Sequence, residues 1–246
     1  MRYFLRLKFE GTFYSGWQIQ PNAPTVQETL QSALSTILRT STEVIGAGRT
    51  DAGVHATGMY AHFDSDEIDL DIKHKLNRIL PQNIAIDDVY PVVSDAHARF
   101  TAINRSYLYR IHLHKNPFLE KRSYHHYSTL NVDAMNAAAK YLIGEKNFRS
   151  FEKSRAEENT GICTVMKAYW EEKGEGELHF HITANRFLRN MVRAITGTLL
   201  DVGMNKISPE SMLEIIELQS RQKAGVSVPA HGLYLTNVEY PQEIYL

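Results

Sequence analysis

The chain has 246 residues, of which 43% are hydrophobic, and its formal net charge is −1. This composition predicts a large core in one or two domains, and it excludes collagen, coiled coils and disordered chains. No apolar run approaches the roughly 20 residues of a membrane span, and the charged start excludes a signal peptide. Cys163 is the only cysteine, so no intrachain disulfide can form, and the cytoplasm is the expected compartment.

The first part of the chain predicts strands that alternate with helices. Apolar and charged side chains alternate over residues 1–9, which is typical of a half-buried antiparallel strand. Thr25-x-x-Glu28 is a capping box, so a helix is expected over residues 25–40. The remaining expectations are a short strand at 44–45, a strand over 55–63, a helix over 71–80 and a strand over 83–92.

The second part repeats this order. Residues 98–114 are rich in β-formers and lack Gly and Pro, which predicts one long strand, or two with a bend. Further along we expect a helix over 131–144, a hairpin over 164–184, helices over 186–200 and 208–219, and a last strand over 231–240. Strands in hairpin order with helices between them predict an α+β fold with antiparallel sheets and helices packed on one face. The division expected near residue 105 gives two halves, 1–105 and 106–246.

Basic residues gather in two segments although the net charge is close to zero. Residues 97–122 hold six Lys or Arg against one acid, Glu120, and residues 186–193 hold three arginines and no acid. A neutral protein with segregated charge can carry a basic face for nucleic acid, but ordinary surface patchiness explains the pattern equally well. Charge alone therefore leaves the partner open.

The segment "GAGRTDAGVH" places Arg49 and Asp51 two residues apart among three glycines. A tight turn beside Gly53 explains the aspartate without any function, and this is the more common outcome. In an extended strand, however, residues two apart share a face, and a turn has no need of the arginine. The alternative is a strand end that delivers a carboxylate to a substrate.

Three other groups of side chains have both a functional and a structural interpretation. Arg189 and Arg193 are four residues apart on a predicted helix, where they form either a solvated basic face or a pair of cations for an anionic ligand. Tyr107 and Tyr109 alternate on a predicted strand, where they either fill the core or stack on a base.

The histidines form the third group, as period-two pairs at 112/114 and 179/181. No third ligand stands at metal spacing, so a solvated strand face is the better interpretation and no metal is expected.

Five stretches of the chain resemble the TruA family of tRNA pseudouridine synthases. They occur in the family's order between residues 9 and 241: "GTFYSGWQIQ", "GAGRTDAGVHATG", "DAHARFTAINRSYLY", "FLRNMVRAITGTLL" and "HGLYLTNVEYP". The resemblance implies two α/β halves whose antiparallel sheets join into an extended central sheet, with the active-site cleft between the halves. It also implies a homodimer that isomerises uridine to pseudouridine at positions 38, 39 and 40 of the tRNA anticodon stem-loop.

The resemblance assigns roles to four residues. Asp51 matches the catalytic aspartate, and Arg193 matches the arginine that pairs with it. Tyr107 matches the tyrosine that stacks on the uracil, and Arg49 the arginine that helps to turn the base out. The N-terminal half would thus carry the aspartate, and the C-terminal half its arginine partner.

The implied chemistry accounts for so small a set of residues. Isomerisation breaks the bond from ribose C1′ to N1 and makes a bond from C1′ to C5, so one carboxylate suffices as nucleophile or base, and no redox cofactor is needed. Two alternatives remain weaker. A non-catalytic RNA-binding module gives no reason for Asp51, and a metal-dependent hydrolase lacks its ligand spacing.

Overall fold

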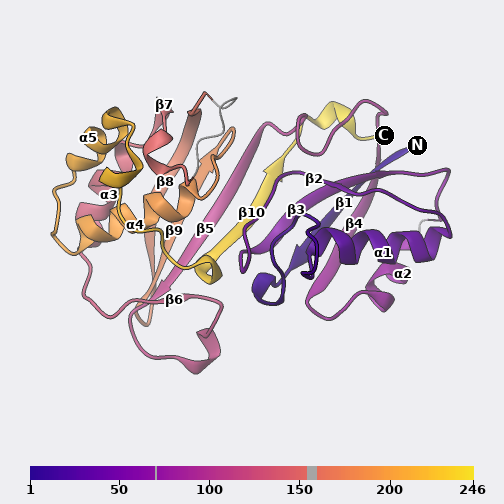
Figure 1. Ribbon diagram of the computed structural model, residues 1–246, viewed down its shortest axis with the longest axis horizontal. Coiled ribbons are helices and arrows are strands. Elements are labelled where there is room, and N and C mark those ends of the chain that lie inside the picture. The colour runs from indigo at the N-terminus through magenta and orange to yellow at the C-terminus, as the bar shows by residue number, and fades with distance from the viewer. Residues whose placement is uncertain (70, 154–159) are drawn as a thin grey trace. The chain divides into compact units, whose positions relative to one another are not determined.

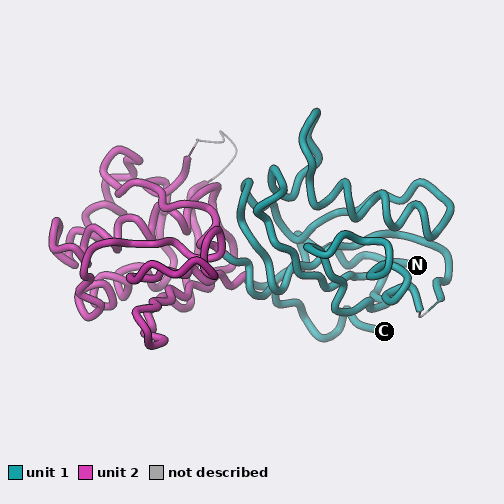
Figure 2. Tube along the Cα trace, turned by 90° about the horizontal axis from the view of Figure 1, so that it is seen from below, with its two compact units in different colours: residues 1–104, 234–246 teal, residues 105–233 magenta. Residues whose placement is uncertain are grey.

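The computed structural model describes residues 1–69, 71–153 and 160–246. They form two compact units, which Figure 2 distinguishes by colour. Unit 1 comprises residues 1–104 and 234–246, and unit 2 comprises residues 105–233. The C-terminal segment, which the sequence-based division grouped with the second half, therefore belongs to unit 1. Each helix in the described ranges is too short or too polar to cross a membrane.

Unit 1 is built on a sheet with the strand order β4-β1-β3-β10 (Figure 1). Its strands are β1 (Arg2–Phe9), β2 (Ile45–Gly46), β3 (His55–Asp64), β4 (Ile84–Val92) and β10 (Leu233–Glu239). β1 pairs antiparallel with both β3 and β4, and β2 adds antiparallel to β3. β10 pairs parallel with β3 through Tyr234 opposite His55, which attaches the end of the chain to this unit.

Two helices complete unit 1, α1 (Val26–Leu38) and α2 (Ile72–Ile79). The predicted cap of α1 is confirmed, because the Thr25 hydroxyl accepts a hydrogen bond from the Glu28 amide at 3.3 Å. The helix buries Leu30 and Leu34 completely, as its apolar spacing predicts. The cap and the buried stripe together fix where α1 begins and which face it turns to the core.

Unit 2 has the strand order β5-β9-β8-β7, with β6 parallel to β5. Its strands are β5 (Asn104–His112), β6 (Tyr124–His125), β7 (Gly144–Asn147), β8 (Ile162–Gly174) and β9 (Glu177–Ala184). Its helices are α3 (Val132–Lys140), α4 (Met191–Gly203) and α5 (Ser211–Leu218), and α3 packs on both α4 and β8. Alternate residues of β9 are buried, so one face of this sheet carries the core. The prediction of mixed α and β structure around a large sheet is confirmed.

Three predicted elements begin later than expected. Residues 98–103 form a turn instead of a strand, because the Thr101 hydroxyl accepts from the His97 amide at 2.9 Å and the Thr101 amide donates back to the His97 carbonyl. α4 begins at residue 191 and not at 186, because Asn190 has a φ of +67°, which no helix tolerates. α5 likewise begins at Ser211, after a turn at residues 208–210.

Candidate active site

Arg49 and Asp51 lie in the loop between β2 and β3, so the expectation that they share a strand face is wrong. Arg49 is exposed and Asp51 is half-buried. The Asp51 carbonyl accepts a hydrogen bond from the Val54 amide at 3.1 Å, and Gly53 has a φ of +78°. Asp51 therefore opens a tight turn, and this turn sets where its carboxylate stands. The glycine explains why the chain leaves the extended conformation here.

A second segment, residues 11–17, packs directly against this loop. The Trp17 amide donates to the Thr50 carbonyl at 3.1 Å, and the Gly53 amide donates to the Tyr14 carbonyl at 3.4 Å. Gly16 has a φ of +96°, and a Cβ added there would stand 2.4 Å from the Thr50 carbonyl oxygen. Only glycine allows the two backbones to approach this closely, so the loop that carries Asp51 is held by main-chain contacts.

Trp17 and Gln27 connect the loop to the core of unit 1. The Trp17 side chain is 2% exposed, and its ring lies so close to Gly46 that an added Cβ would meet it at 2.4 Å. Its carbonyl accepts from the Gln27 amide on α1 at 3.0 Å, and the Gln27 side chain donates to the Val44 carbonyl at 2.8 Å. The stretch "GTFYSGWQIQ" therefore supports the stretch "GAGRTDAGVHATG".

His55 fixes the other end of the loop, and the sequence analysis did not single it out. Its side chain is 2% exposed, and Nδ1 accepts a hydrogen bond from the Gly11 amide at 3.0 Å. The ring also stacks on Tyr234 with the centroids 4.6 Å apart. Because an N–H donor faces Nδ1, this nitrogen carries no proton. His55 is thus a positioning residue. The signal in the sequence was a polar residue that begins an otherwise apolar strand.

In unit 2, the structure separates Tyr107 from Tyr109. Tyr109 is fully buried, its hydroxyl donates to the Pro229 carbonyl at 2.7 Å, and burial raises its pKa well above the usual range. Tyr107 lies on the same face of β5 but is only half-buried, and its ring meets Phe187 edge-to-face at 5.0 Å. Tyr109 therefore fills the core, whereas Tyr107 keeps partly accessible ring surface.

Arg193 is fixed by a segment that crosses α4, which we call the strap (residues 224–229). Arg193 Nε donates to the Val228 carbonyl at 2.8 Å, and the Val228 amide donates to the Arg193 carbonyl at 3.2 Å. The strap lies so close to the helix that a Cβ on Gly197 would stand 1.8 Å from the Val226 carbonyl oxygen. These contacts determine the direction of the guanidinium from two sides. Burial, together with the charge of Arg193, lowers the pKa of His231.

Arg189 does not share a helix face with Arg193, so that prediction is wrong. It lies before the first turn of α4, on the far side of Asn190 and its positive φ. Its side chain is exposed, and its carbonyl accepts from the Lys153 amide at 3.1 Å. Of the two arginines, only Arg193 belongs to the helix.

The four paired histidines agree only in part with the predicted solvated face. His114 is exposed, but His112 is only 4% exposed. His179 and His181 are half-buried beside Glu177 and Glu171, at 3.5 Å and 3.3 Å. Burial lowers the pKa of all three histidines. In the ranges that the structure describes, no group of three or more His, Cys, Asp or Glu side chains is arranged to hold a metal ion.

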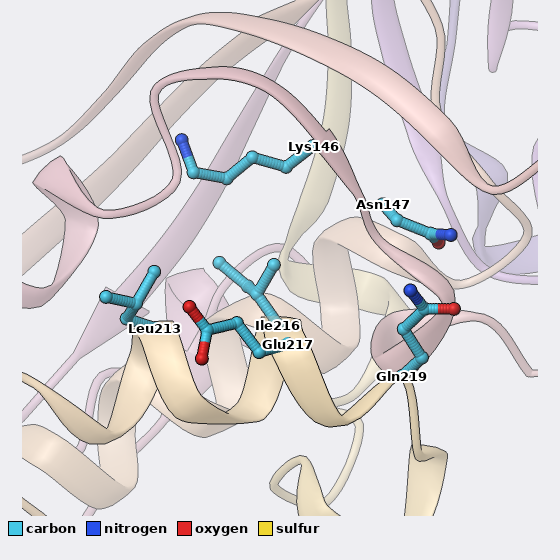
Figure 3. A pocket seen from close by; sticks show the side chains of 6 residues that line it. All are labelled: Lys146, Asn147, Leu213, Ile216, Glu217 and Gln219. Carbon is cyan, nitrogen blue, oxygen red and sulfur yellow. The ribbon is translucent and has the colours of Figure 1, made fainter.

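A shallow cavity of about 280 Å³ lies between β7 and α5, apart from all four candidate residues. Figure 3 shows the Lys146 side chain above the apolar side chains of Leu213 and Ile216, with Glu217 beside them. None of the residues that line the cavity has an aromatic ring that could stack on a base. We therefore do not assign the cavity to the reaction that the four candidate residues indicate.

Comparison with known proteins identifies the relatives of this chain. The family described as tRNA pseudouridine synthase matches residues 7–101 and 138–241. The protein "tRNA pseudouridine synthase A" of Bacteroides fragilis is 51% identical, over 99% of this chain and 98% of its own length. The protein of the same name in Bacillus subtilis is 40% identical, over 98% and 99%.

Similarity to solved structures is weaker. A chain of a Cbf5-Nop10-Gar1 complex aligns with a TM-score of 0.39 at 12% identity, covering 94% of this chain and 57% of that one. A likeness at this level carries no argument. The two relatives match nearly the whole sequence, and the family match covers most of it, so together they show the family. This chain belongs to the tRNA pseudouridine synthase family.

Proposed function

We propose that the protein isomerises uridine to pseudouridine at positions 38, 39 and 40 of the tRNA anticodon stem-loop, with Asp51 as the catalytic nucleophile or base. The observation that carries the proposal is the loop of Asp51. Its backbone is locked on residues 11–17 through a glycine contact, which presents a single half-buried carboxylate in a fixed place. Relatives that match along nearly the whole chain carry the name tRNA pseudouridine synthase A.

The reaction needs few groups because nothing is added to or lost from the uridine. The C1′–N1 bond breaks, the uracil turns, and C1′ bonds to C5; the hydrogen on C5 is replaced by one on N1. A carboxylate can act as nucleophile or base in this sequence. Water would intercept the broken intermediate, so the site must hold the detached ring and exclude solvent.

The other three residues take roles that suit their surroundings. Arg193 is held by the strap and would keep Asp51 ionised by offering it an opposite charge. Tyr107 would stack on the uracil through its partly accessible ring. A uridine in a stacked stem must first be turned out at a cost of a few kcal/mol, and the exposed Arg49 would hold the vacated space and a phosphate.

Two statements about the assembly belong to the same proposal. The working unit is a homodimer in the cytoplasm, and the basic segments 97–122 and 186–193 contact tRNA phosphates. In a sizing experiment we expect about twice the chain mass of 28.1 kDa. Because neutralised phosphates release counterions, log affinity for tRNA should fall linearly with log salt. A fully active monomer, or affinity that ignores salt, would count against this.

The experiment for the reaction maps pseudouridine in a tRNA transcript incubated with the purified protein. We expect pseudouridine at positions 38–40 and none when these positions carry cytidine. Activity should persist in excess EDTA, whereas a metal-dependent hydrolase would be inhibited. A product elsewhere in the tRNA would refute the proposed positions, and tRNA binding without any product would favour the RNA-binding module.

Tyr107 has its own test. Replacing it with Phe keeps the ring, while replacing it with Ala removes a stacking contact of about 1–3 kcal/mol. We therefore expect Tyr107→Phe to bind tRNA like the wild type and Tyr107→Ala to bind it more weakly. If both variants bind and react alike, Tyr107 does not stack on the base.

A further inference from the structure

The loop between β5 and β6, residues 113–123, carries features that the catalytic residues do not explain. Figure 1 shows the chain around β6 extending beyond the strands of unit 2. Phe118 in this loop is 84% exposed, and Tyr127, just after β6, is 86% exposed. Single exposed apolar side chains are common in proteins, so the contacts of these two rings decide whether they form a binding surface.

Tyr127 is the outer end of a column of three rings. His112, at the end of β5, is 4% exposed, and its ring stacks on that of His125 with centroids 4.9 Å apart and planes within 8°. The ring of His125 in turn lies 4.2 Å from that of Tyr127 at 43°. The column therefore runs from the interior to the solvent and ends in an exposed phenol ring.

The column is held by strand pairing at its base. His112 lies opposite His125 in the parallel β5–β6 pair, and the His126 amide donates to the His112 carbonyl at 2.9 Å. On the outer side, the Ser128 amide donates to His126 Nδ1 at 3.4 Å. Because the backbone is fixed on both sides of His125, the His125 ring has a defined place, and the Tyr127 ring lies against it. A base stacked on the accessible face of Tyr127 would extend this column.

The surroundings of the column are basic. Residues 113–127 contain Lys115, Lys121 and Arg122, all exposed, against the single acid Glu120, so the formal balance is +3 − 1 = +2 without the histidines. Exposed aromatic rings next to Lys and Arg form the usual combination for a single-stranded nucleic acid, whose bases stack while its phosphates pair with cations. An apolar partner protein would not need these charges.

We propose that Tyr127 is a stacking platform for an unpaired tRNA base, and that Lys115, Lys121 and Arg122 bind the neighbouring phosphates. This inference rests on the proposed function, since it takes tRNA as the substrate. The platform is separate from the reacting uridine. His112 is five residues beyond Tyr107 on β5, which is about 17 Å at the rise of a strand. The platform therefore holds a second base of the same tRNA while the target uridine reacts.

The test compares Tyr127→Ala with Tyr127→Phe in tRNA binding and turnover. Loss of one stacked base should weaken the Kd for tRNA by about 5- to 150-fold in the Ala variant, while the Phe variant stays within about twofold of the wild type. KM should rise with Kd, and kcat at saturating tRNA should not change. Binding is measured without turnover, so the result does not depend on whether the reaction assignment holds.

Tyr169→Ala is the matched control. Tyr169 is also exposed and stacks on a histidine, His181, at 4.8 Å and 12°, but it lies beside Glu171 instead of a basic loop. This variant should bind tRNA like the wild type. The proposal is overturned if Tyr127→Ala binds tRNA normally, or if Tyr169→Ala loses as much affinity. A change of molecular mass in Tyr127→Ala would also overturn it, since the ring would then serve contact between subunits.

Discussion

The Asp51 loop in unit 1 and the Arg193 helix in unit 2 are held in place in different ways. Asp51 lies in a loop with no regular structure, held by main-chain hydrogen bonds to residues 11–17. Arg193 lies on α4, in which nearly every residue is buried, and the strap binds its backbone and side chain. Both regions depend on a glycine, Gly16 in the loop and Gly197 in the helix. At each glycine, a carbonyl oxygen of the neighbouring segment occupies the place where a Cβ would stand.

This comparison shows where each region is vulnerable. The loop depends on a conformation that L-residues avoid, since Gly16 has a φ of +96°. Gly197 lies inside the regular helix α4, so its backbone suits any residue. A side chain there is excluded only by lack of space. A methyl group added to either glycine should therefore displace a functional residue, and the loop should suffer more, since backbone strain adds to the steric conflict.

Gly16→Ala is expected to have the largest effect. The new Cβ would meet the Thr50 carbonyl oxygen at 2.4 Å, and the residue must also adopt a positive φ. We expect about 1–3 kcal/mol lower stability and, because Asp51 follows Thr50 directly, about 100-fold lower kcat with tRNA affinity retained. Turnover kinetics and filter binding measure the two effects separately.

Gly48→Ala is the control for that variant. Gly48 lies in the same loop, but nothing stands within 4 Å of a Cβ added there. It should react like the wild type. If Gly48→Ala and Gly16→Ala lose equal activity, the loop tolerates no added side chain anywhere. The close contact of Gly16 with Thr50 would then not explain the loss.

Gly197→Ala is expected to have an intermediate effect. The added Cβ would lie 1.8 Å from the Val226 carbonyl oxygen, so the strap must move and loosen the hydrogen bond of Arg193. Overpacking costs about 1–3 kcal/mol, and alanine's better helix propensity offsets about 1 kcal/mol of it. We expect a net loss of about 0–2 kcal/mol in chemical denaturation and about 10-fold lower activity.

Val226→Ala tests the same strap from its outer side. The Val226 side chain is 84% exposed, so its loss should change neither stability nor activity. If Val226→Ala loses as much stability and activity as Gly197→Ala, the strap holds α4 through its side chains and not through its backbone.

The smallest effect concerns the pH dependence of unit 1. His62 on β3 is buried, its Nδ1 accepts from the Ala98 amide at 3.1 Å, and burial, with Arg2 and His97, lowers its pKa to about 4. The ordinary value is about 6.5, so between these values the unfolded chain binds more protons than the folded one. Stability should therefore fall as the pH decreases from 6.5, and the fall should level off below about 4.

His62→Gln isolates that contribution, because the amide oxygen can accept from Ala98 but does not titrate in this range. The difference in unfolding free energy between the two proteins should change with pH only below about 6.5. Parallel curves for the wild type and His62→Gln would show that folding does not lower the pKa of His62.

The sequence predicted most of what depends on local patterns. The cap of α1 at Thr25, the cap of α3 at Asn131 and the hairpin turn at Gly174–Gly176 all stand where local rules place them. The predicted strand over residues 98–103 was wrong, because hydrogen bonds between His97 and Thr101 form a turn despite the β-rich composition. Such contacts cannot be predicted from residue propensities.

The candidate site was harder to predict, since its support is tertiary. The spacing of Arg49 and Asp51 predicted a strand, yet the positive φ of Gly53 and the packing of residues 11–17 make it a loop. Likewise, no pattern distinguishes the half-buried Tyr107 from the fully buried Tyr109, because they share a strand face and differ only in what covers them. The family resemblance assigned roles to Arg49, Asp51 and Tyr107, and the tertiary contacts explain how the fold places these residues.

The most direct test of the account compares Asp51→Asn with the wild type in a single-turnover reaction. Asparagine is nearly isosteric, so the turn closed by the Asp51 carbonyl should remain and tRNA should bind with about the same affinity. Without a nucleophile or base, pseudouridine formation should fall by at least about 10²–10⁴-fold. Substantial turnover by Asp51→Asn would contradict the assignment of the catalytic group, and with it the central claim about this loop.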